Sequence, residues 1–332
     1  MENIRLLEAP HLSASGKLYV SLMLALVFAM CMAMLPVDSF VDRDAYLAYA
    51  EGSLAIVALN AAQGVGVVLT NEPLWLLINA LLSLLFDPEY CVRIVIGVSA
   101  FLVAKTVVQN NFQRLIVVVL FLLLPQVLKN YVIHLRQGLA IGVFMAGWYA
   151  STDRRRWALM LLTPFIHASF FFVIAFLLFN RLLEGIKASA VIRVIAFLAV
   201  GLFLSFATIW LAAGLGARQA GEYQGAAGAD ISGLGFIFWT LFGCIYALQG
   251  KKFLRENMLA VGVLIFYLTS YFFLPVAARI FESMLLLILI AGLGLTNYRK
   301  TAFWILFSFY FLAQWYPRLG LPGLGWGVEN YV

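Results

Sequence analysis

The residues most able to do chemistry in this sequence are a few ionisable side chains that stand alone in apolar surroundings. Three of them are the isolated arginines Arg136, Arg218 and Arg279. A charge at the centre of a membrane helix costs about 2.5–3.5 kcal/mol on insertion scales, so each needs a partner or a water-filled cavity. Local ion pairs are one solution, with Glu282 three residues after Arg279 and Glu222 four residues after Arg218. The alternative is that the guanidinium groups bind phosphate or diphosphate, whose oxygens they match with paired N–H donors.

Two histidines accompany these arginines. His134 precedes Arg136 by two residues, and on one helix their side chains would point about 200° apart. His134 therefore belongs to the preceding loop if both contact one ligand, and otherwise it is an interfacial histidine. His167 follows Pro164 in an apolar stretch, where the proline breaks a helix. Its imidazole can act as a base or donate to an anion, or it caps carbonyls that the proline leaves free.

Carboxylates occur in two places that matter for chemistry. The segment 42–46 contains Asp42, Asp44 and Tyr46. A carboxylate beside aromatic rings suits a sugar, because the carboxylate accepts hydrogen bonds from hydroxyls while the rings stack on the pyranose. The plainer interpretation of this segment is an acidic loop that follows membrane topology. Glu72 followed by Pro73 is typical of a helix start, where acid and proline are both favoured.

Several kinds of site are not indicated by the sequence. It has no GxSxG, HExxH or GxxxxGK[ST] motif, and no GxGxxG after a strand. The three cysteines, at positions 31, 91 and 244, lie in apolar runs without metal-ligand spacing. We therefore expect neither a metal centre nor a cofactor, and no nucleic-acid partner.

The elements that must position these residues are membrane helices. Hydrophobic residues make up 64% of the 332 positions and charged residues 11%, whereas a soluble domain has about 25% charged residues. Mean hydropathy is +0.97. The apolar runs are long and continuous rather than alternating, which indicates helices and not barrel strands. The expected spans are 17–36, 53–70, 73–86, 90–105, 114–128, 132–151, 157–179, 190–212, 231–249, 257–275, 279–297 and 301–316.

The sequence thus predicts an all-α polytopic integral membrane protein of about 11–13 transmembrane segments, forming a single membrane domain over residues 1–332. Outer loops are expected at about 37–52 and 213–231. If 157–179 is a hairpin of two half-helices broken near Pro164 and His167, every Lys/Arg cluster, such as Arg154–Arg156, lies on the cytoplasmic side. Counting spans then puts Arg136 and His167 outside but Glu72 inside. Glu72 moves outside if 53–70 is only a re-entrant piece.

Several motifs in this order resemble the EpsG family of Wzy-like bacterial polysaccharide polymerases. They are the string from Tyr131 to Ala140 with Arg136-Gln137-Gly138, the basic turn 154–156 and the string from Pro164 to Ser169. The elements Asp42-x-x-x-Tyr46 and Glu72–Asn79, and the late Arg279-Ile-Phe, also fit. The resemblance covers about residues 36–300. It implies a likeness to lipid-phosphate-dependent, GT-C-like membrane glycosyltransferases.

The resemblance also implies an activity and a location. Such a polymerase transfers a glycan from undecaprenyl diphosphate to the non-reducing end of another lipid-linked repeat unit, at the periplasmic face of the bacterial inner membrane. The product would be an O-antigen or an exopolysaccharide, and a flippase and a chain-length regulator are the expected partners. The expected catalytic residues are Asp42, Arg136, His167 and Arg279. The expected substrate-binding residues are Asp44, Tyr46, Glu72, His134, Gln137, Arg218 and Tyr223.

The chemistry is consistent with these residue types. Glycosyl transfer from a lipid diphosphate requires stabilisation of the departing diphosphate, which arginines supply. It also requires a base for the acceptor hydroxyl; Asp42 is the first candidate, before Asp44, His167 and Glu72. Two other functions fit a chain of this composition. One is a transporter or flippase of lipid-linked oligosaccharide, although the internal repeat common in transporters is not visible. The other is a membrane acyltransferase that acts on glycans through His167.

Overall fold

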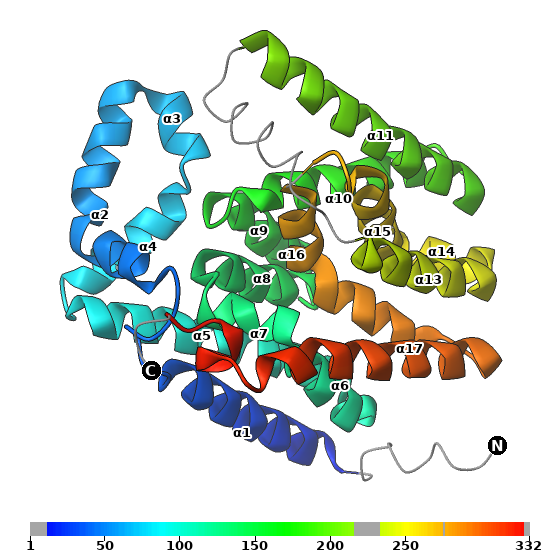
Figure 1. The fold of residues 1–332 in the computed structure, drawn as a ribbon, viewed down its shortest axis with the longest axis horizontal. Coiled ribbons are helices and arrows are strands. Elements are labelled where there is room, and N and C mark those ends of the chain that lie inside the picture. Colours follow the sequence, from blue (N-terminus) through cyan, green and yellow to red (C-terminus); the bar gives the residue numbers. More distant parts are fainter. Residues whose placement is uncertain (1–11, 216–232, 275, 329–332) are drawn as a thin grey trace. The chain divides into compact units, whose positions relative to one another are not determined.

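The protein is an all-α membrane protein, described here from a computed structural model that covers residues 12–215, 233–274 and 276–328. No β-strand occurs in these ranges (Figure 1). The helices of the first half are α1 Ala14–Ala33, α2 Arg43–Gln63, α3 Val65–Thr70, α4 Pro73–Ser83, α5 Pro88–Asn110, α6 Leu115–Leu122, α7 Pro125–Val132, α8 Leu135–Trp148 and α9 Asp153–Leu162. Those of the second half are α10 Ser169–Gly185, α11 Ala190–Leu215, α13 Leu234–Gln249, α14 Lys251–Glu256, α15 Met258–Ser270, α16 Val276–Ala291 and α17 Asn297–Trp315.

Five of these helices are long and apolar enough to cross a membrane, within the part of the chain that the structure describes. They are α1, α2, α5, α11 and α16, the last counted together with the 3₁₀ turn that follows it. The segment expected as one span at 114–128 is instead bent by 70° between α6 and α7, where Pro125 opens the second helix. Proline removes a backbone donor and clashes with the preceding turn, which explains the break. If this bent pair is one span, the number rises to six.

The second helix differs most from the sequence-based expectation. We expected a loop at 37–52 and a span at 53–70, but α2 already begins at Arg43 and ends at Gln63. Gly64, with φ +110°, then interrupts the chain before the short helix α3. The polar residues Arg43, Asp44 and Glu51 lower the local hydropathy, so a search for apolar runs misses the first half of this helix.

The expected break in 157–179 is confirmed. Helix α9 ends at Leu162, a 3₁₀ turn covers Thr163–Phe165, and α10 begins at Ser169. Pro164 lies in the turn and His167 follows it. The side of the membrane on which this break lies stays a prediction.

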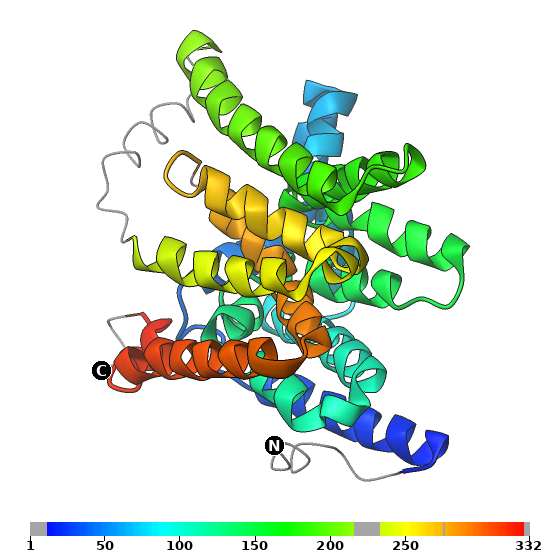
Figure 2. The same cartoon turned by 90° about the vertical axis from the view of Figure 1, so that its right-hand side faces the viewer.

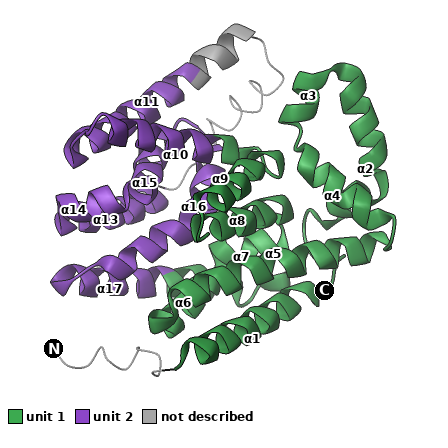
Figure 3. Ribbon diagram, turned by 180° about the vertical axis from the view of Figure 1, so that it is seen from behind, with its two compact units in different colours: residues 1–171, 311–332 green, residues 172–310 purple. Residues whose placement is uncertain are grey.

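The chain divides into two compact units, which we describe separately (Figure 3). Unit 1 comprises residues 1–171 and 311–332, and its central element is α5, which contacts α1, α2, α4, α6, α7 and α8. Small residues allow close approach: a Cβ on Gly142 of α8 would lie 3.2 Å from Leu102 Cβ of α5. Close packing through small residues is the usual way for helices to associate in a membrane.

Unit 2 comprises residues 172–310 and is arranged around α15, which contacts α11, α13, α14 and α16. Helix α11 runs along α15, as Figure 2 shows. The core of the unit is aromatic; Trp239 and Phe281, for example, meet edge to face with ring centroids 4.7 Å apart. Such edge-to-face pairs add stability beyond the buried area.

Candidate functional site

The candidate site of unit 1 is centred on Glu72, in the turn between α3 and α4. As the sequence predicted, a helix starts here: Glu72 is the N-cap of α4 and Pro73 its first residue. The backbone of Glu72 is left-handed, with φ +53°, and its side chain makes no capping hydrogen bond. A left-handed backbone costs a non-glycine residue about 1–3 kcal/mol and is concentrated at functional sites. The left-handed backbone therefore marks Glu72 as a candidate functional residue.

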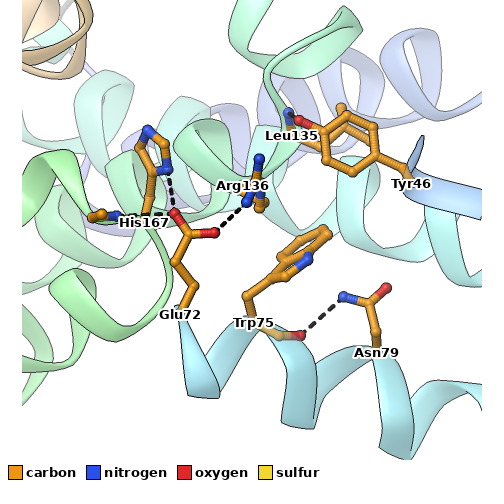
Figure 4. Close-up of polar contacts among 8 residues, drawn as sticks. Tyr46, Glu72, Trp75, Asn79, Leu135, Arg136 and His167 are labelled. Carbon is orange, nitrogen blue, oxygen red and sulfur yellow. Dashed lines mark hydrogen bonds and ion pairs between the residues drawn. The ribbon is translucent and has the colours of Figure 1, made fainter. Parts of the chain in front are cut away.

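Both carboxylate oxygens of Glu72 are engaged (Figure 4). Oε2 accepts from the guanidinium of Arg136 and forms an ion pair with it. Oε1 lies 2.9 Å from Nδ1 of His167 and 3.0 Å from the backbone nitrogen of Ala168, which donates to it. The carboxylate thus joins its own segment to two others that are 64 or more residues away from it in sequence. Its side chain is only 10% exposed, so water competes weakly for these contacts.

Arg136 is held at the start of α8. His134 is the N-cap of this helix, with non-helical backbone angles, so it lies in the preceding turn, which was one of the two alternatives for this residue. Gly138 follows at a very close approach to α7: a Cβ there would lie 2.1 Å from the carbonyl oxygen of Asn130. Only glycine fits this position. The Arg-Gln-Gly string therefore has a packing reason for its third residue.

His167 lies in the break between α9 and α10. Its backbone nitrogen donates to Thr163 O, which closes the turn after Pro164. Its Nδ1 faces Glu72, whereas Nε2 is buried and has no hydrogen-bond partner within the described ranges of the chain. An ionised carboxylate at Nδ1 favours the tautomer with the proton on that nitrogen. Nε2 is then left with a lone pair, ready to accept a proton.

Aromatic residues of α2 and α4 line the other side of Arg136. The guanidinium lies 5.3 Å from the centroid of the Tyr49 ring, within the range of a cation–π contact. Trp75 meets both Tyr46 and Tyr49 edge to face. The Tyr46 hydroxyl accepts from the backbone nitrogen of Leu135, 3.1 Å away, and so fixes the start of α8 against α2.

Electrostatic interactions determine the ionisation state of Glu72. Burial raises the pKa of Glu72, but the hydrogen bond from His167 and the positive charge of Arg136 lower it more, so the net pKa lies below its usual value of 4.5. Glu72 is therefore an anion at neutral pH and a weak base. It orients Arg136 and His167. Like Nε2 of His167, Nε of Arg136 is buried and has no hydrogen-bond partner among the residues that the structure describes.

The structure brings together four of the residues predicted for the site: Tyr46, Glu72, Arg136 and His167. Beside them on α8, Gln137 is buried.

Of the remaining predicted residues, two lie at the start of α2, one belongs to unit 2 and two are not described. Asp42 and Asp44 are exposed at the start of α2, and among the described residues no hydrogen bond or ion pair joins either to this cluster. Arg279 is exposed in α16 and belongs to unit 2. Arg218 and Tyr223 lie outside the described residues.

One part of the predicted topology was wrong. Counting spans put Glu72 on the opposite side from Arg136 and His167, yet Glu72 contacts both. The reason is the interruption at Gly64: the predicted span 53–70 is not one straight helix, and α4 packs back against α2. The re-entrant alternative considered for this stretch fits the structure better.

Some neighbouring residues were missed by the sequence reasoning. Arg43 is completely buried, with Nε donating to Val132 O at 2.7 Å and the guanidinium 5.6 Å from the Phe40 ring centroid. Trp75 is 1% exposed, and its indole nitrogen has no hydrogen-bond partner in the described part of the chain. The only signal for Arg43 was a lone arginine between two aspartates, which resembles an ordinary solvated loop.

Comparisons with known proteins give one match. The model of the EpsG family matches residues 17–321, which include the whole Glu72 cluster. No curated protein and no solved structure matches the chain. Among the described residues, no group of three or more His, Cys, Asp or Glu side chains could hold a metal ion.

Proposed function

This chain belongs to the EpsG family of Wzy-like polysaccharide polymerases, and from this membership and the Glu72 cluster we propose a specific activity. The protein transfers a glycan chain from a polyprenyl diphosphate to the non-reducing-end sugar of a second lipid-linked repeat unit. The reaction takes place at the periplasmic face of a bacterial inner membrane. The observation that carries this proposal is the pair of unused groups beside one carboxylate, Nε2 of His167 and Nε of Arg136.

The pair suits the two charges that develop during glycosyl transfer. The acceptor hydroxyl attacks the anomeric carbon of the donor sugar, and its proton passes to Nε2 of His167 as the new C–O bond forms. The bond from the anomeric carbon to the diphosphate oxygen breaks, and the departing diphosphate keeps its electron pair. Arg136 donates hydrogen bonds to that diphosphate, where preorganised donors stabilise the developing charge.

Glu72 acts in this scheme as a positioning residue. It keeps the proton of His167 on Nδ1 and holds the Arg136 guanidinium beside the Tyr49 ring. The arrangement of carboxylate, histidine and attacking hydroxyl is the one by which a buried acid orients a histidine base in other enzymes. His167 therefore replaces Asp42 as the preferred general base.

The test is a complementation experiment in cells that lack the chromosomal copy. Arg136→Ala is expected to abolish long-chain polysaccharide while the lipid-linked single repeat accumulates, because the donor binds poorly and its diphosphate is not stabilised. Arg156→Ala is the control, since Arg156 pairs with Asp153 outside the cluster; chain length should be unchanged. Normal chains in Arg136→Ala would refute the proposal. If Arg136→Ala instead abolishes outward transport, so that no lipid-linked repeat unit accumulates on the outer side, a flippase function is favoured.

A further inference from the structure

A second charged site lies in unit 2 and has no part in the Glu72 chemistry. A hollow of about 430 Å³ opens between the α10–α11 turn and helix α14. Its charged lining consists of five cations and one carboxylate: Lys187, Arg193, Lys251, Lys252, Arg255 and Glu184. Five positive charges and one negative charge leave an excess of four positive charges around a single hollow.

Two of these cations occupy positions that their own local structure disfavours. Lys187 caps the end of α10 with φ +54°, where its backbone nitrogen donates to Glu184 O and the next one to Leu183 O. This cap usually carries glycine, because a left-handed backbone costs other residues about 1–2 kcal/mol. Arg193 lies near the start of α11, where the helix dipole opposes a positive charge.

Arg193 is also buried, with a side chain 5% exposed. Its Nε donates to Ala188 O at 3.1 Å, and its Nη1 donates to Glu184 Oε1 at 3.0 Å. These contacts place the arginine and close the α10–α11 turn. They neutralise one cation and leave the charges of the other four unbalanced within the lining.

The three cations on α14 differ from Arg193 in that they are not buried. Lys251, Lys252 and Arg255 are exposed, and Lys252 is at the 4.0 Å limit of a weak pair with Glu256. Like charges that line one hollow repel one another. An anion that bridges the α10–α11 turn and α14 relieves this repulsion. Phosphate oxygens suit the role because they accept several charge-assisted hydrogen bonds at once.

We propose that this hollow binds a phosphate-bearing anion, separately from the polymerase site. Two sources share this chemistry: the headgroup of an anionic phospholipid, and a soluble phosphate or diphosphate compound. The positive clusters of the sequence are predicted to be cytoplasmic, and anionic lipid headgroups are available on that side. The inference does not depend on the proposed function, since it needs no polymer formation.

Binding can be measured directly on the purified full chain. One arm titrates inorganic diphosphate into protein in neutral detergent by calorimetry. The other exchanges the protein into nanodiscs of phosphatidylcholine with or without phosphatidylglycerol and detects retained phosphatidylglycerol by native mass spectrometry. The proposal expects binding in at least one arm, and which arm responds identifies the source. Absence of binding in both arms overturns it.

The matched variants are Lys251→Gln/Lys252→Gln and, as control, Arg154→Gln/Arg155→Gln. Each removes two exposed adjacent cations. We expect the first to weaken binding by about tenfold, the loss of about one charge-assisted contact, and the control to leave binding unchanged. Equal effects of the two would reduce the site to general charge attraction and overturn the proposal.

Glu184→Gln tests whether removal of a negative charge from the lining strengthens anion binding. It removes the carboxylate from the lining and releases Arg193, so binding should tighten; weaker binding by a variant with wild-type thermal stability contradicts the site. If Glu184→Gln or the double variant does not fold, Arg255→Gln replaces it. This single exposed substitution should weaken binding several-fold, and unchanged binding would overturn the proposal.

Discussion

Replacing Glu72 by glutamine is the most informative change in this protein. The substitution keeps the size of the side chain and removes its charge. A glutamine oxygen in the place of Oε1 can still accept from both of its donors, Ala168 N and His167 Nδ1. Its amide NH₂ then faces the Arg136 guanidinium, a donor against a donor, and the ion pair is lost.

The size of the effect follows from the contacts removed. The charge-assisted bond to Arg136, worth about 1.5–3 kcal/mol, is lost, and the bond from His167 falls to the strength of a neutral hydrogen bond, about 0.5–1.5 kcal/mol. The Arg136 side chain is 32% exposed, so water recovers part of this, and about 3 kcal/mol remains. If that energy positions the reacting groups in the transition state, polymer formation falls by about 100-fold or more. The assay is the rate of ladder formation from a lipid-linked repeat unit by protein in proteoliposomes.

Glu89→Gln is the matched control. It removes the same charge from an ion pair with Arg93 in which the Glu89 side chain is 56% exposed, and such pairs contribute about 0–1 kcal/mol. Its rate should stay within about twofold of wild type. Thermal unfolding in detergent separates loss of fold from loss of positioning. A Glu72→Gln rate within twofold of wild type, in folded protein, would refute the positioning role.

Three further outcomes are expected. Gly138→Ala should destabilise the protein by about 1–3 kcal/mol, because its Cβ would meet Asn130 O at 2.1 Å. The control Gly52→Ala, whose Cβ would have nothing within 4 Å, should not lower the unfolding temperature. Equal unfolding temperatures of the two variants would contradict the close approach at Gly138. Because the pKa of Glu72 in the folded protein is lowered, its ion pair stabilises the fold fully above pH 4.5 and loses that contribution as the pH falls through the lower folded value. Wild type should therefore lose more stability than Glu72→Gln below pH 4.5, and parallel profiles would speak against the ion pair. In a cysteine-free background, the single variants Arg155→Cys and Asp44→Cys should be labelled from opposite sides of the membrane. Labelling of both from the same side would contradict the predicted topology.

Local features of the site could be predicted from the sequence. Pro164 marked the helix break that holds His167, and the 200° separation on a helix left a loop position as one of two alternatives for His134. Both follow from backbone rules that act within a few residues. Glu72 before Pro73 was correctly interpreted as a helix start for the same reason.

The convergence of Glu72 with Arg136 and His167 could not be predicted, because the contacts span 64 and 95 residues. Counting spans even separated them, since the count depends on every helix crossing the membrane straight. The helix is interrupted at Gly64 by a change in backbone conformation, which the hydropathy pattern does not indicate. The burial of Arg43 was hidden for a similar reason: a charged residue lowers the local hydropathy whether or not it is buried.

The most direct test of the His167–Arg136 site is polymer formation by purified protein with a lipid-linked repeat unit as the sole substrate. Wild type should produce a ladder of long chains and release polyprenyl diphosphate. His167→Ala should leave the single repeat unextended at neutral pH while it keeps the wild-type unfolding temperature within a few degrees. A ladder of normal rate from His167→Ala, or no ladder from folded wild type, would contradict the central claim.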